Sequence, residues 1–415
     1  MEERLLKTTA SQLAGKAAYL FGAGKIGRAT LEHLRGIVDL QGILDNNKKE
    51  MVAAGTVYPV SPPSATQPPS AGRNREGRSS AEQARQCAED AIVIVAVLDY
   101  EPAVQQLKAL GWTESKIFIS VSWKIPFADD PECSGYEDIL FSEAGARELL
   151  ADPDSKTLYD FILENRGGSV NLYQYSQLSS IQGSHGYWEE VPVPGNLDCA
   201  IMDCGAYGGD SIAQILEAVS PKSCTYYAFE PDDHVMLTLE KAEERILEKA
   251  LRKESLLGNV RFVNIHKGVW LKEAVLTFHY HSEDAASTLS DNQNLKTFAS
   301  QYPGTTGNQK PERAEEKDFV EDEPNTVKVT SIDQIQVHEK DLFIKMDIEG
   351  AEAAAIRGAE RTIREKRPFL AVCAYHRPSD LFMLPALMKS LNPNYRIFLK
   401  GGLHYTYYAI DETYF

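Results

Sequence analysis

The chain has 415 residues, more than one hydrophobic core typically organises, and this length predicts two domains. Hydrophobic residues make up 43% of it and charged residues 25%, as in soluble globular proteins. The net charge of −17 argues against a nucleic-acid-binding protein, which needs a basic surface to neutralise phosphates. The start, Met1-Glu2-Glu3-Arg4, is not an apolar leader, and no apolar run reaches membrane-spanning length. We therefore expect a cytoplasmic protein that binds neither nucleic acid nor membrane, with its six cysteines reduced.

The first domain is predicted from a strand, a glycine loop, a helix and a second strand that ends in an acid. The strands are expected at 17–21 and 38–44. The loop glycines and the acid are Gly22, Gly24, Gly27 and Asp45. In mononucleotide-binding units such glycines lie against a phosphate, and an acid about 20 residues on binds a ribose. A second nucleotide site is therefore a hypothesis for this domain, although a lone glycine fingerprint is a weak signal.

Two further apolar strands, expected at 91–97 and 116–121, complete a small α/β domain over residues 1–125. Residues 61–90 are rich in Pro, Ser, Gly and Arg in their first part and lack apolar periodicity, which predicts a flexible insertion. Apolar residues at helical spacing between 142 and 165 then indicate a helix within a connector over residues 126–195.

The second domain, residues 196–415, alternates strands and helices again. We expect strands at 199–202, 225–229, 260–265, 270–280, 327–330, 342–346 and 369–374, and a terminal hairpin at 395–399 and 405–410. Helices are expected at 211–219, at 234–251, and from the Asp347 region through Arg367. The polar, acidic stretch 291–326 predicts a second flexible insertion.

The most informative feature is a glycine turn that follows a buried strand, with a carboxylate at the end of the next strand. Small residues at Gly205, Ala206 and Gly208 let a ligand lie against the backbone. Glu230 is placed where a carboxylate accepts both ribose hydroxyls of an adenosine. Asp203 precedes the glycines, whereas a dinucleotide site prefers a helix N-terminus facing a pyrophosphate. An acid suits a cofactor with an amino group and no phosphate, and S-adenosyl-L-methionine fits that description.

Five motifs stand in order along the second half of the chain, and together they are specific although each one is weak alone. They are Asp203-Cys204-Gly205-Ala206-Tyr207-Gly208-Gly209-Asp210, Phe229-Glu230-Pro231, Ser331-Ile332-Asp333, Ile344-Lys345-Met346-Asp347-Ile348-Glu349-Gly350-Ala351-Glu352 and Ala374-Tyr375-His376-Arg377-Pro378-Ser379-Asp380-Leu381. The chain thereby resembles the FkbM family of S-adenosylmethionine-dependent methyltransferases over about residues 155–410. The resemblance implies an α/β protein of two domains: a small N-terminal Rossmann-like nucleotide-binding-type domain, often fused ahead of this family, and a C-terminal Rossmann-like class I methyltransferase domain.

Methyl transfer from a sulfonium requires an acceptor oxygen aligned with the methyl carbon and a group that removes its proton. We predict His376 as that base, because its ordinary pKa suits neutral pH and it ends a strand beside the site. Asp347 is the rival base, since it follows the strand expected at 342–346, which faces the reaction centre in this fold class. Tyr187 and Glu349 are candidate contacts with the acceptor.

Asn264 and His266, at the end of the third strand, are candidate contacts with the adenine edge. The carboxylates of Asp347, Glu349 and Glu352 could together bind a divalent cation, or they could cap the helix that begins there. Capping is the preferred interpretation for Glu352 and a functional role for Asp347. No metal ligand is therefore assigned, and a divalent metal is the less favoured alternative.

The sequence thus predicts an S-adenosylmethionine-dependent methyltransferase. The family resemblance implies O-methylation of a hydroxyl on a sugar, a glycan intermediate or a secondary metabolite, so the partner is a small-molecule or carbohydrate acceptor; no oligomeric state is predicted. One alternative is a nicotinamide-dependent oxidoreductase or nucleotide-sugar-binding protein that uses the first domain, but the chain lacks a recognisable catalytic Tyr-x-x-x-Lys. Another is a non-catalytic binding module, against which the intact Asp203, Glu230 and Asp347 count.

Overall fold

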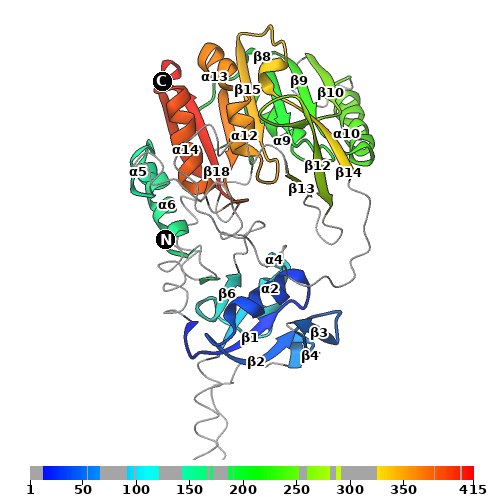
Figure 1. The fold of residues 1–415 in the computed structure, drawn as a ribbon, viewed down its shortest axis with the longest axis vertical. Coiled ribbons are helices and arrows are strands. Elements are labelled where there is room, and N and C mark those ends of the chain that lie inside the picture. Colours follow the sequence, from blue (N-terminus) through cyan, green and yellow to red (C-terminus); the bar gives the residue numbers. More distant parts are fainter. Residues whose placement is uncertain are drawn as a thin grey trace, which may run out of the picture. The chain divides into compact units, whose positions relative to one another are not determined.

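The computed structural model describes most of the chain in segments. They are residues 13–53, 55–65, 91–97, 100–120, 143–165, 169–171, 186–189, 191–251, 259–280, 287–290, 325–377, 379–401 and 404–415. The chain divides into two compact units, Met1–Ser122 with Leu158–Gln182 and Trp123–Thr157 with Gly183–Phe415 (Figure 1). The expected connector over 126–195 is therefore divided between the two units. In the described part of the chain, no helix has the length and apolarity that crossing a membrane requires.

The first unit is built on a mostly parallel sheet with the strand order β3-β4-β2-β1-β5-β6-β7. Its strands are β1 (Ala17–Phe21), β2 (Asp39–Leu44), β3 (Glu50–Ala53), β4 (Thr56–Ser61), β5 (Ile92–Val95), β6 (Ile117–Ser120) and β7 (Ser169–Asn171). Its helices are α2 (Lys25–Leu34) and α4 (Tyr100–Ala109). The four predicted strands of this unit are confirmed as β1, β2, β5 and β6, which pair in parallel. Their apolar side chains form the core of the unit with α2.

The sequence missed the β3–β4 hairpin, and the predicted insertion begins too early. β4 pairs with β2 through Val60 and Ser61, and a 3-10 turn follows at Pro63–Ala65. The sequence does not indicate this hairpin, because β3 is only four residues long and Val57, on β4, is exposed. The remainder of the expected insertion, residues 66–90, lies outside the described residues.

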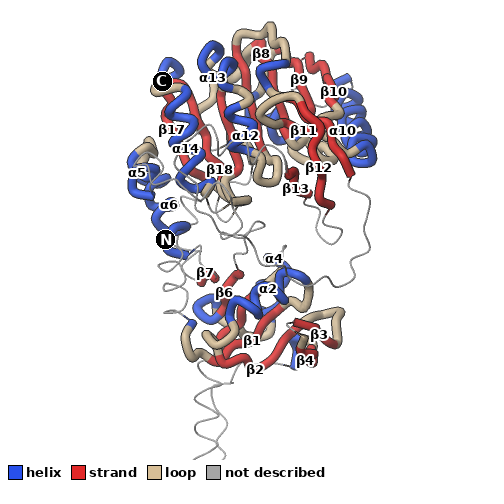
Figure 2. The backbone as a smooth tube through the Cα atoms, in the orientation of Figure 1, coloured by secondary structure: helices blue, strands red, loops and turns tan. Residues whose placement is uncertain are grey.

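The second unit contains two sheets, and the larger of them has the order β10-β9-β8-β15-β16-β18-β17 (Figure 2). Its strands are β8 (Asp198–Cys204), β9 (Ser223–Phe229), β10 (Asn259–Ile265), β15 (Asp341–Met346), β16 (Phe369–Cys373), β17 (Tyr395–Lys400) and β18 (Thr406–Asp411). The first five strands in the sheet pair in parallel, and the last two form the predicted terminal hairpin. This mixed α/β sheet confirms the predicted fold class.

The helices of this unit are α5 (Glu143–Glu148), α9 (Ile212–Val219), α10 (Asp233–Leu251), α12 (Glu352–Arg357), α13 (Glu360–Lys366) and α14 (Asp380–Leu391). Helix α6 (Pro153–Asn165) begins in this unit and belongs to the first unit from Leu158 onward. The helix expected over 142–165 is broken before Pro153, where the Asp152 carboxylate accepts the Ser155 amide at 2.9 Å and caps α6. The helix expected through Arg367 is interrupted at Gly358, where a Cβ would lie 2.3 Å from the Trp270 carbonyl oxygen.

Helix α14 was not predicted. It carries Pro385 in its interior, which normally breaks a helix. Most of its other side chains are buried, so its sequence shows no polar face with helical periodicity. Both of the signals used to recognise a helix from sequence are therefore missing here.

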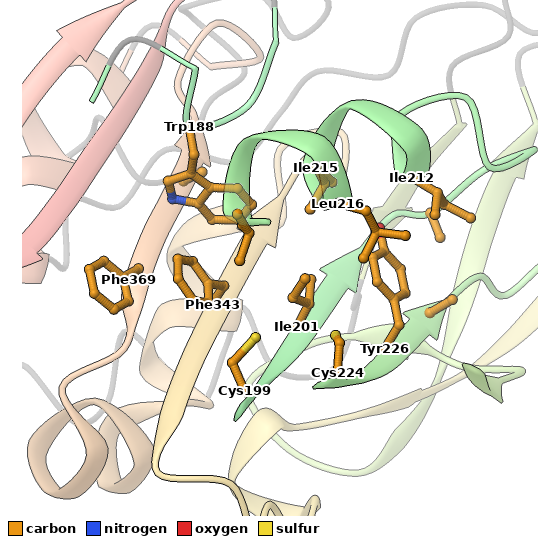
Figure 3. Packing of buried hydrophobic residues seen from close by; sticks show 14 of the residues in the cluster. Trp188, Cys199, Ile201, Ile212, Ile215, Leu216, Cys224, Tyr226, Phe343 and Phe369 are labelled. Carbon is orange, nitrogen blue, oxygen red and sulfur yellow. The ribbon is translucent and has the colours of Figure 1, made fainter. Parts of the chain in front are cut away.

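The main core of the second unit lies where α9 packs on the sheet (Figure 3). Ile212, Ile215 and Leu216 of α9 pack over side chains of β8 and β9. Trp188 contacts Phe343 edge-on with ring centroids 5.5 Å apart, and is buried. Trp188 is thus a core residue. Its packing fixes the position of the turn that also carries Tyr187.

A smaller sheet in the order β11-β14-β12-β13 completes this unit. Its strands are β11 (Gly268–Val269), β12 (Ala274–Tyr280), β13 (Ser287–Ser290) and β14 (Asn325–Thr330). The second expected insertion ends too late, because Asn325 and Thr326 already pair with β12. Residues 291–324, the rest of that insertion, lie outside the described residues.

Candidate functional site

The carboxyl ends of the central strands of the larger sheet meet at one edge. Cys204 of β8 lies opposite Phe229 of β9 and Met346 of β15, and Met346 lies opposite Val372 of β16. Ligands of open α/β sheets bind outside the carboxyl ends of the strands. The predicted residues that follow these strands are therefore brought to one edge, as the sequence predicted; they are Gly205, Ala206, Gly208, Glu230, Asp347, Glu349 and His376.

The glycine turn after β8 requires a residue without a side chain. Gly205 has φ of +79°, and a Cβ there would lie 2.0 Å from the backbone oxygen of Asp347. The amides of Gly205 and Ala206 donate to the last carbonyl of β9 at 3.1 and 3.0 Å. A Cβ on Gly208 would lie 3.3 Å from the Thr238 side chain. The turn is thus packed closely against the ends of β9 and β15 and against α10. Close approach of a ligand to these small residues stays a prediction.

Glu230 has the geometry of a hydroxyl acceptor. Its two carboxylate oxygens accept the Tyr207 amide at 3.1 Å and the Asp232 amide at 2.9 Å. Each oxygen has two acceptor positions, so each has capacity for a further hydroxyl. The side chain is only 7% exposed, and burial raises its pKa above the ordinary value for glutamate. These features fit the predicted binding of two ribose hydroxyls.

Asp203 is buried beneath the turn. One carboxylate oxygen forms an ion pair with Lys345 Nζ at 2.9 Å, and the other accepts the Tyr226 hydroxyl at 2.8 Å and the Ser211 hydroxyl at 3.4 Å. Lys345 Nζ also donates to the carbonyl of Gly205 at 2.6 Å. This arrangement lets Asp203 fix the position of the glycine turn, while its predicted contact with the amino group of a cofactor stays a prediction.

Lys345 is a buried partner of the site residues whose role the sequence did not predict. Burial alone would lower its pKa, but the Asp203 carboxylate raises the pKa of Lys345 above its usual range. The ammonium group also lies 5.4 Å from the centre of the Tyr187 ring. The available signal was a single charged residue within the apolar strand 342–346, because a buried lysine requires a partner.

Asp347 is held by two phenols at the end of β15. The Tyr187 hydroxyl donates to Oδ2 at 3.1 Å and the Tyr375 hydroxyl to Oδ1 at 3.0 Å. Burial would raise the pKa of Asp347, but the nearby His376 and Lys345 lower it below its usual range. The structure therefore brings the predicted Tyr187 to Asp347 and adds Tyr375, which the sequence quoted only as part of a motif.

His376 is completely buried among three carboxylates. Its Nδ1 lies 2.9 Å from Glu352 Oε1, and its Nε2 lies 3.3 Å from Asp347 Oδ1 and 3.6 Å from Glu349 Oε2. Burial alone would lower the pKa of His376, but Glu352 and the other carboxylates raise it to about 9. An imidazole that carries both protons has no lone pair left to accept another. The geometry therefore does not favour the predicted role of His376 as the base.

Glu352 has a structural partner as well as His376. Its Oε1 accepts the Ile348 amide at 3.0 Å, and Ile348 lies before α12. Glu352 does lie in the first turn of α12, where an acid is favourable, but the helix has no side-chain capping hydrogen bond, so the preferred interpretation of Glu352 as a cap stays a prediction. Asp347, Glu352 and His376 each place one donor atom within 4.8 Å of the others, close enough to be considered as metal ligands.

The two candidate adenine contacts lie at and just beyond the end of β10, next to β9 in the sheet. The Asn264 amide donates to Glu243 of α10 at 3.0 Å. His266 is half-exposed, and its Nδ1 lies 3.3 Å from Asp233. His266 thus remains accessible beside Glu230, whereas the amide of Asn264 is already used in packing α10.

The glycine loop of the first unit packs closely against other backbone groups of the same unit. A Cβ on Gly22 would lie 2.5 Å from the Ala96 carbonyl oxygen, and one on Gly27 would lie 1.9 Å from the carbonyl oxygen of Gly22. The Asp45 carboxylate accepts three backbone amides, those of Ala23, Asn47 and Lys48, at 2.9, 2.8 and 3.0 Å. Gly22, Gly27 and Asp45 thus have structural roles, whereas a Cβ on Gly24, the other predicted glycine, would meet nothing within 4 Å. The second nucleotide site stays a hypothesis.

A Rossmann-like sheet with a glycine turn and an acid at successive strand ends is an architecture that binds nucleotide-type cofactors. Residues 203–397 match the family model described as the methyltransferase FkbM domain, so the second unit contains an FkbM methyltransferase domain, as the motifs predicted. The chain is also similar to the crystal structure of methyltransferase FkbM from Methylobacillus flagellatus KT, with 17% identity, a TM-score of 0.56, and coverage of 98% of this chain and 93% of that one. At this identity the likeness concerns the fold. No curated protein matches the chain.

Proposed function

We propose that this methyltransferase uses S-adenosylmethionine and methylates a hydroxyl on a sugar, a glycan intermediate or a secondary metabolite. The observation that carries the proposal is Glu230, whose buried carboxylate keeps free acceptor capacity beside the glycine turn. The family match supports methyl transfer in general. A cofactor with two neighbouring ribose hydroxyls and no phosphate suits this pair of features.

S-adenosylmethionine, when bound, supplies a methyl group on a positively charged sulfur. Glu230 accepts its ribose hydroxyls, and the glycine turn allows close approach of the backbone. Asp347, which accepts the hydroxyls of Tyr187 and Tyr375, would accept a hydrogen bond from the acceptor hydroxyl and would take up its proton on methyl transfer, while the sulfur would keep the electron pair of its bond to the methyl group.

The acceptor class follows from the accessible polar groups. The side chains of Asp347 and Glu349 are 27% and 26% exposed, whereas His376 between them is buried. Two carboxylates at a partly open edge accept hydrogen bonds from neighbouring hydroxyls, and they disfavour an anionic acceptor. A polyhydroxylated, uncharged small molecule or carbohydrate therefore suits the site.

Replacing Glu230 with alanine tests the cofactor assignment. We expect binding of S-adenosylmethionine to weaken by about tenfold or more, because each charge-assisted hydrogen bond contributes about 1.5–3 kcal/mol. Titration calorimetry measures the affinity directly. Glu230→Gln, which keeps the shape and one acceptor oxygen, is expected to lose less affinity for S-adenosylmethionine than Glu230→Ala.

Glu217→Ala, which removes an exposed acid from α9, is the matched control and should bind as the unaltered protein does. Equal affinity in Glu230→Ala and Glu217→Ala would show that the ribose is not bound by Glu230.

A further inference from the structure

Helix α10 and the first half of β10 line a pocket of about 470 Å³. Its wall has an acidic part, Glu240, Glu243 and Glu244, and an apolar part, Leu247, Val260 and Phe262. The helical residues share one face, because residues three and four positions apart are neighbours on a helix. A pocket of this size, acidic on one side and apolar on the other, suits a small ligand.

Glu243 is the buried acid of this pocket. It is only 6% exposed, whereas Glu240 and Glu244 are exposed. Its Oε2 accepts the Asn264 amide at 3.0 Å, but its Oε1 is buried without a hydrogen-bond partner among the described residues. Asn264 Oδ1 is likewise buried without a partner in that part of the chain. Since both atoms are acceptors, a complementary ligand is a hydrogen-bond donor.

The three acids of the pocket repel one another on one helix face. Glu240 and Glu244 are four positions apart and Glu243 lies beside them, a spacing at which like charges destabilise a helix. Burial raises the pKa of Glu243, and the Glu240 carboxylate adds to this effect. None of the three acids forms an ion pair within the described part of the chain. A positively charged ligand would therefore relieve their repulsion.

The nearest basic side chains are directed elsewhere. Arg261 of β10 also contributes to the lining, but its guanidinium donates to the Thr225 hydroxyl of β9 at 3.3 Å. Its side chain lies on the opposite face of the sheet from those of its two neighbours in the strand, because side chains alternate along a strand. Lys241 and Arg245 are two positions from Glu243 on α10, a spacing at which helical side chains do not face each other. The compensating charge must therefore come from a ligand.

We propose that this pocket binds an aliphatic diamine. One ammonium group donates to Oε1 of Glu243, and the hydrocarbon chain packs on Leu247 and Phe262. The second ammonium group lies near the exposed carboxylates of Glu240 and Glu244. An ammonium group supplies both a hydrogen-bond donor and a positive charge. A divalent metal ion suits the pocket less, because it takes several oxygen ligands and gains nothing from an apolar wall.

This pocket is separate from the candidate methyltransferase site. Val260 lies opposite Cys224, near the beginning of β9, whereas Ile265 lies opposite Phe229 at the carboxyl end. The inference therefore goes beyond the proposed function, and binding of the diamine requires neither S-adenosylmethionine nor a methyl acceptor.

Titration calorimetry of the full-length chain with putrescine, a four-carbon diamine, tests the pocket. At low salt, which limits screening, we expect one saturable site per chain. Glu243→Gln should weaken binding by about tenfold or more, because it removes the charge that strengthens the hydrogen bond to the ammonium group. Leu247→Ser should weaken binding by a smaller factor, because the hydrocarbon chain loses an apolar contact.

The matched control is Glu217→Gln, which removes an exposed acid of α9 and should leave the affinity for putrescine unchanged. Mg²⁺, which carries the same charge as the diamine, should displace it only at a much higher concentration. Absence of a saturable site, equal affinity in Glu243→Gln and Glu217→Gln, or displacement by Mg²⁺ at equal concentration would overturn the proposal.

If Glu243→Gln does not fold, Leu247→Ser decides the question, because Leu247 is exposed and its replacement leaves the core intact. Equal affinity for putrescine in Leu247→Ser and Glu217→Gln would then overturn the proposal. Glu230→Ala should bind putrescine as the unaltered chain does, so a failure of the cofactor assignment is distinguishable from a failure of the diamine pocket.

Discussion

Replacing Lys345 with methionine is expected to destabilise the second unit by about 3–5 kcal/mol, because it leaves a buried, unpaired carboxylate. Lys345 and Asp203 are both buried and lie 2.9 Å apart. The Tyr226 hydroxyl would remain as a donor to Asp203, but a neutral donor does not compensate the lost positive charge. Urea unfolding followed by circular dichroism measures the change in the free energy of unfolding.

Two further variants test whether the buried pair contributes more to stability than an exposed ion pair does. Lys222→Met removes the partner of Asp198, a pair at 3.0 Å whose side chains are 62% and 59% exposed, and should cost less than about 1 kcal/mol. The double variant Asp203→Asn with Lys345→Met should recover part of the stability, because no charge is then left unpaired. If Lys345→Met lowers the free energy of unfolding no more than Lys222→Met does, the buried pair is no more important for stability than an exposed ion pair.

Replacing Gly205 with alanine is expected to cost about 2–5 kcal/mol and to abolish tight cofactor binding. This loss in the free energy of unfolding combines about 1–2 kcal/mol for a side chain at positive φ with about 1–3 kcal/mol for overpacking. The new Cβ would lie 2.0 Å from the Asp347 backbone oxygen, so the turn and the end of β15 must move apart. Unfolding experiments and calorimetric titration with S-adenosylmethionine measure the two effects on one preparation.

Gly55→Ala is the matched control, because Gly55 also has positive φ, +73°, but a Cβ there meets nothing within 4 Å. It should show only the backbone cost of about 1–2 kcal/mol and normal cofactor binding. Similar costs for the two glycines would mean that the close approach of β8 and β15 is unimportant.

Much of the second unit could be predicted because its signals are local. Each parallel strand is a short apolar run, and the residue after each strand is fixed at the same edge of the sheet by topology alone. Glu230 and the glycine turn could therefore be placed from spacing. Helix α14 could not, since Pro385 and its extensive burial remove the local pattern.

The candidate site was predicted less completely than the fold, for a physical reason. The charge state of His376 depends on Glu352, 24 positions earlier, and on the exact separation of side chains from different elements. The pairing of Lys345 with Asp203 joins residues 142 positions apart. A single sequence shows that these residues are ionisable, but it does not show which of them face one another.

The outer strand of the larger sheet, β17, has its free edge covered by residues from a distant part of the chain. The Ala151 amide donates to the Ile397 carbonyl at 2.8 Å, and the Ser155 hydroxyl accepts the Leu399 amide at 2.9 Å across 244 positions. An uncovered edge strand offers its amides and carbonyls to any other extended chain, which is a route to aggregation. A protein shortened to begin at residue 196 would lose this cover although its sheet is intact. Ala151 and the first turn of α6 thus prevent intermolecular strand pairing at this edge.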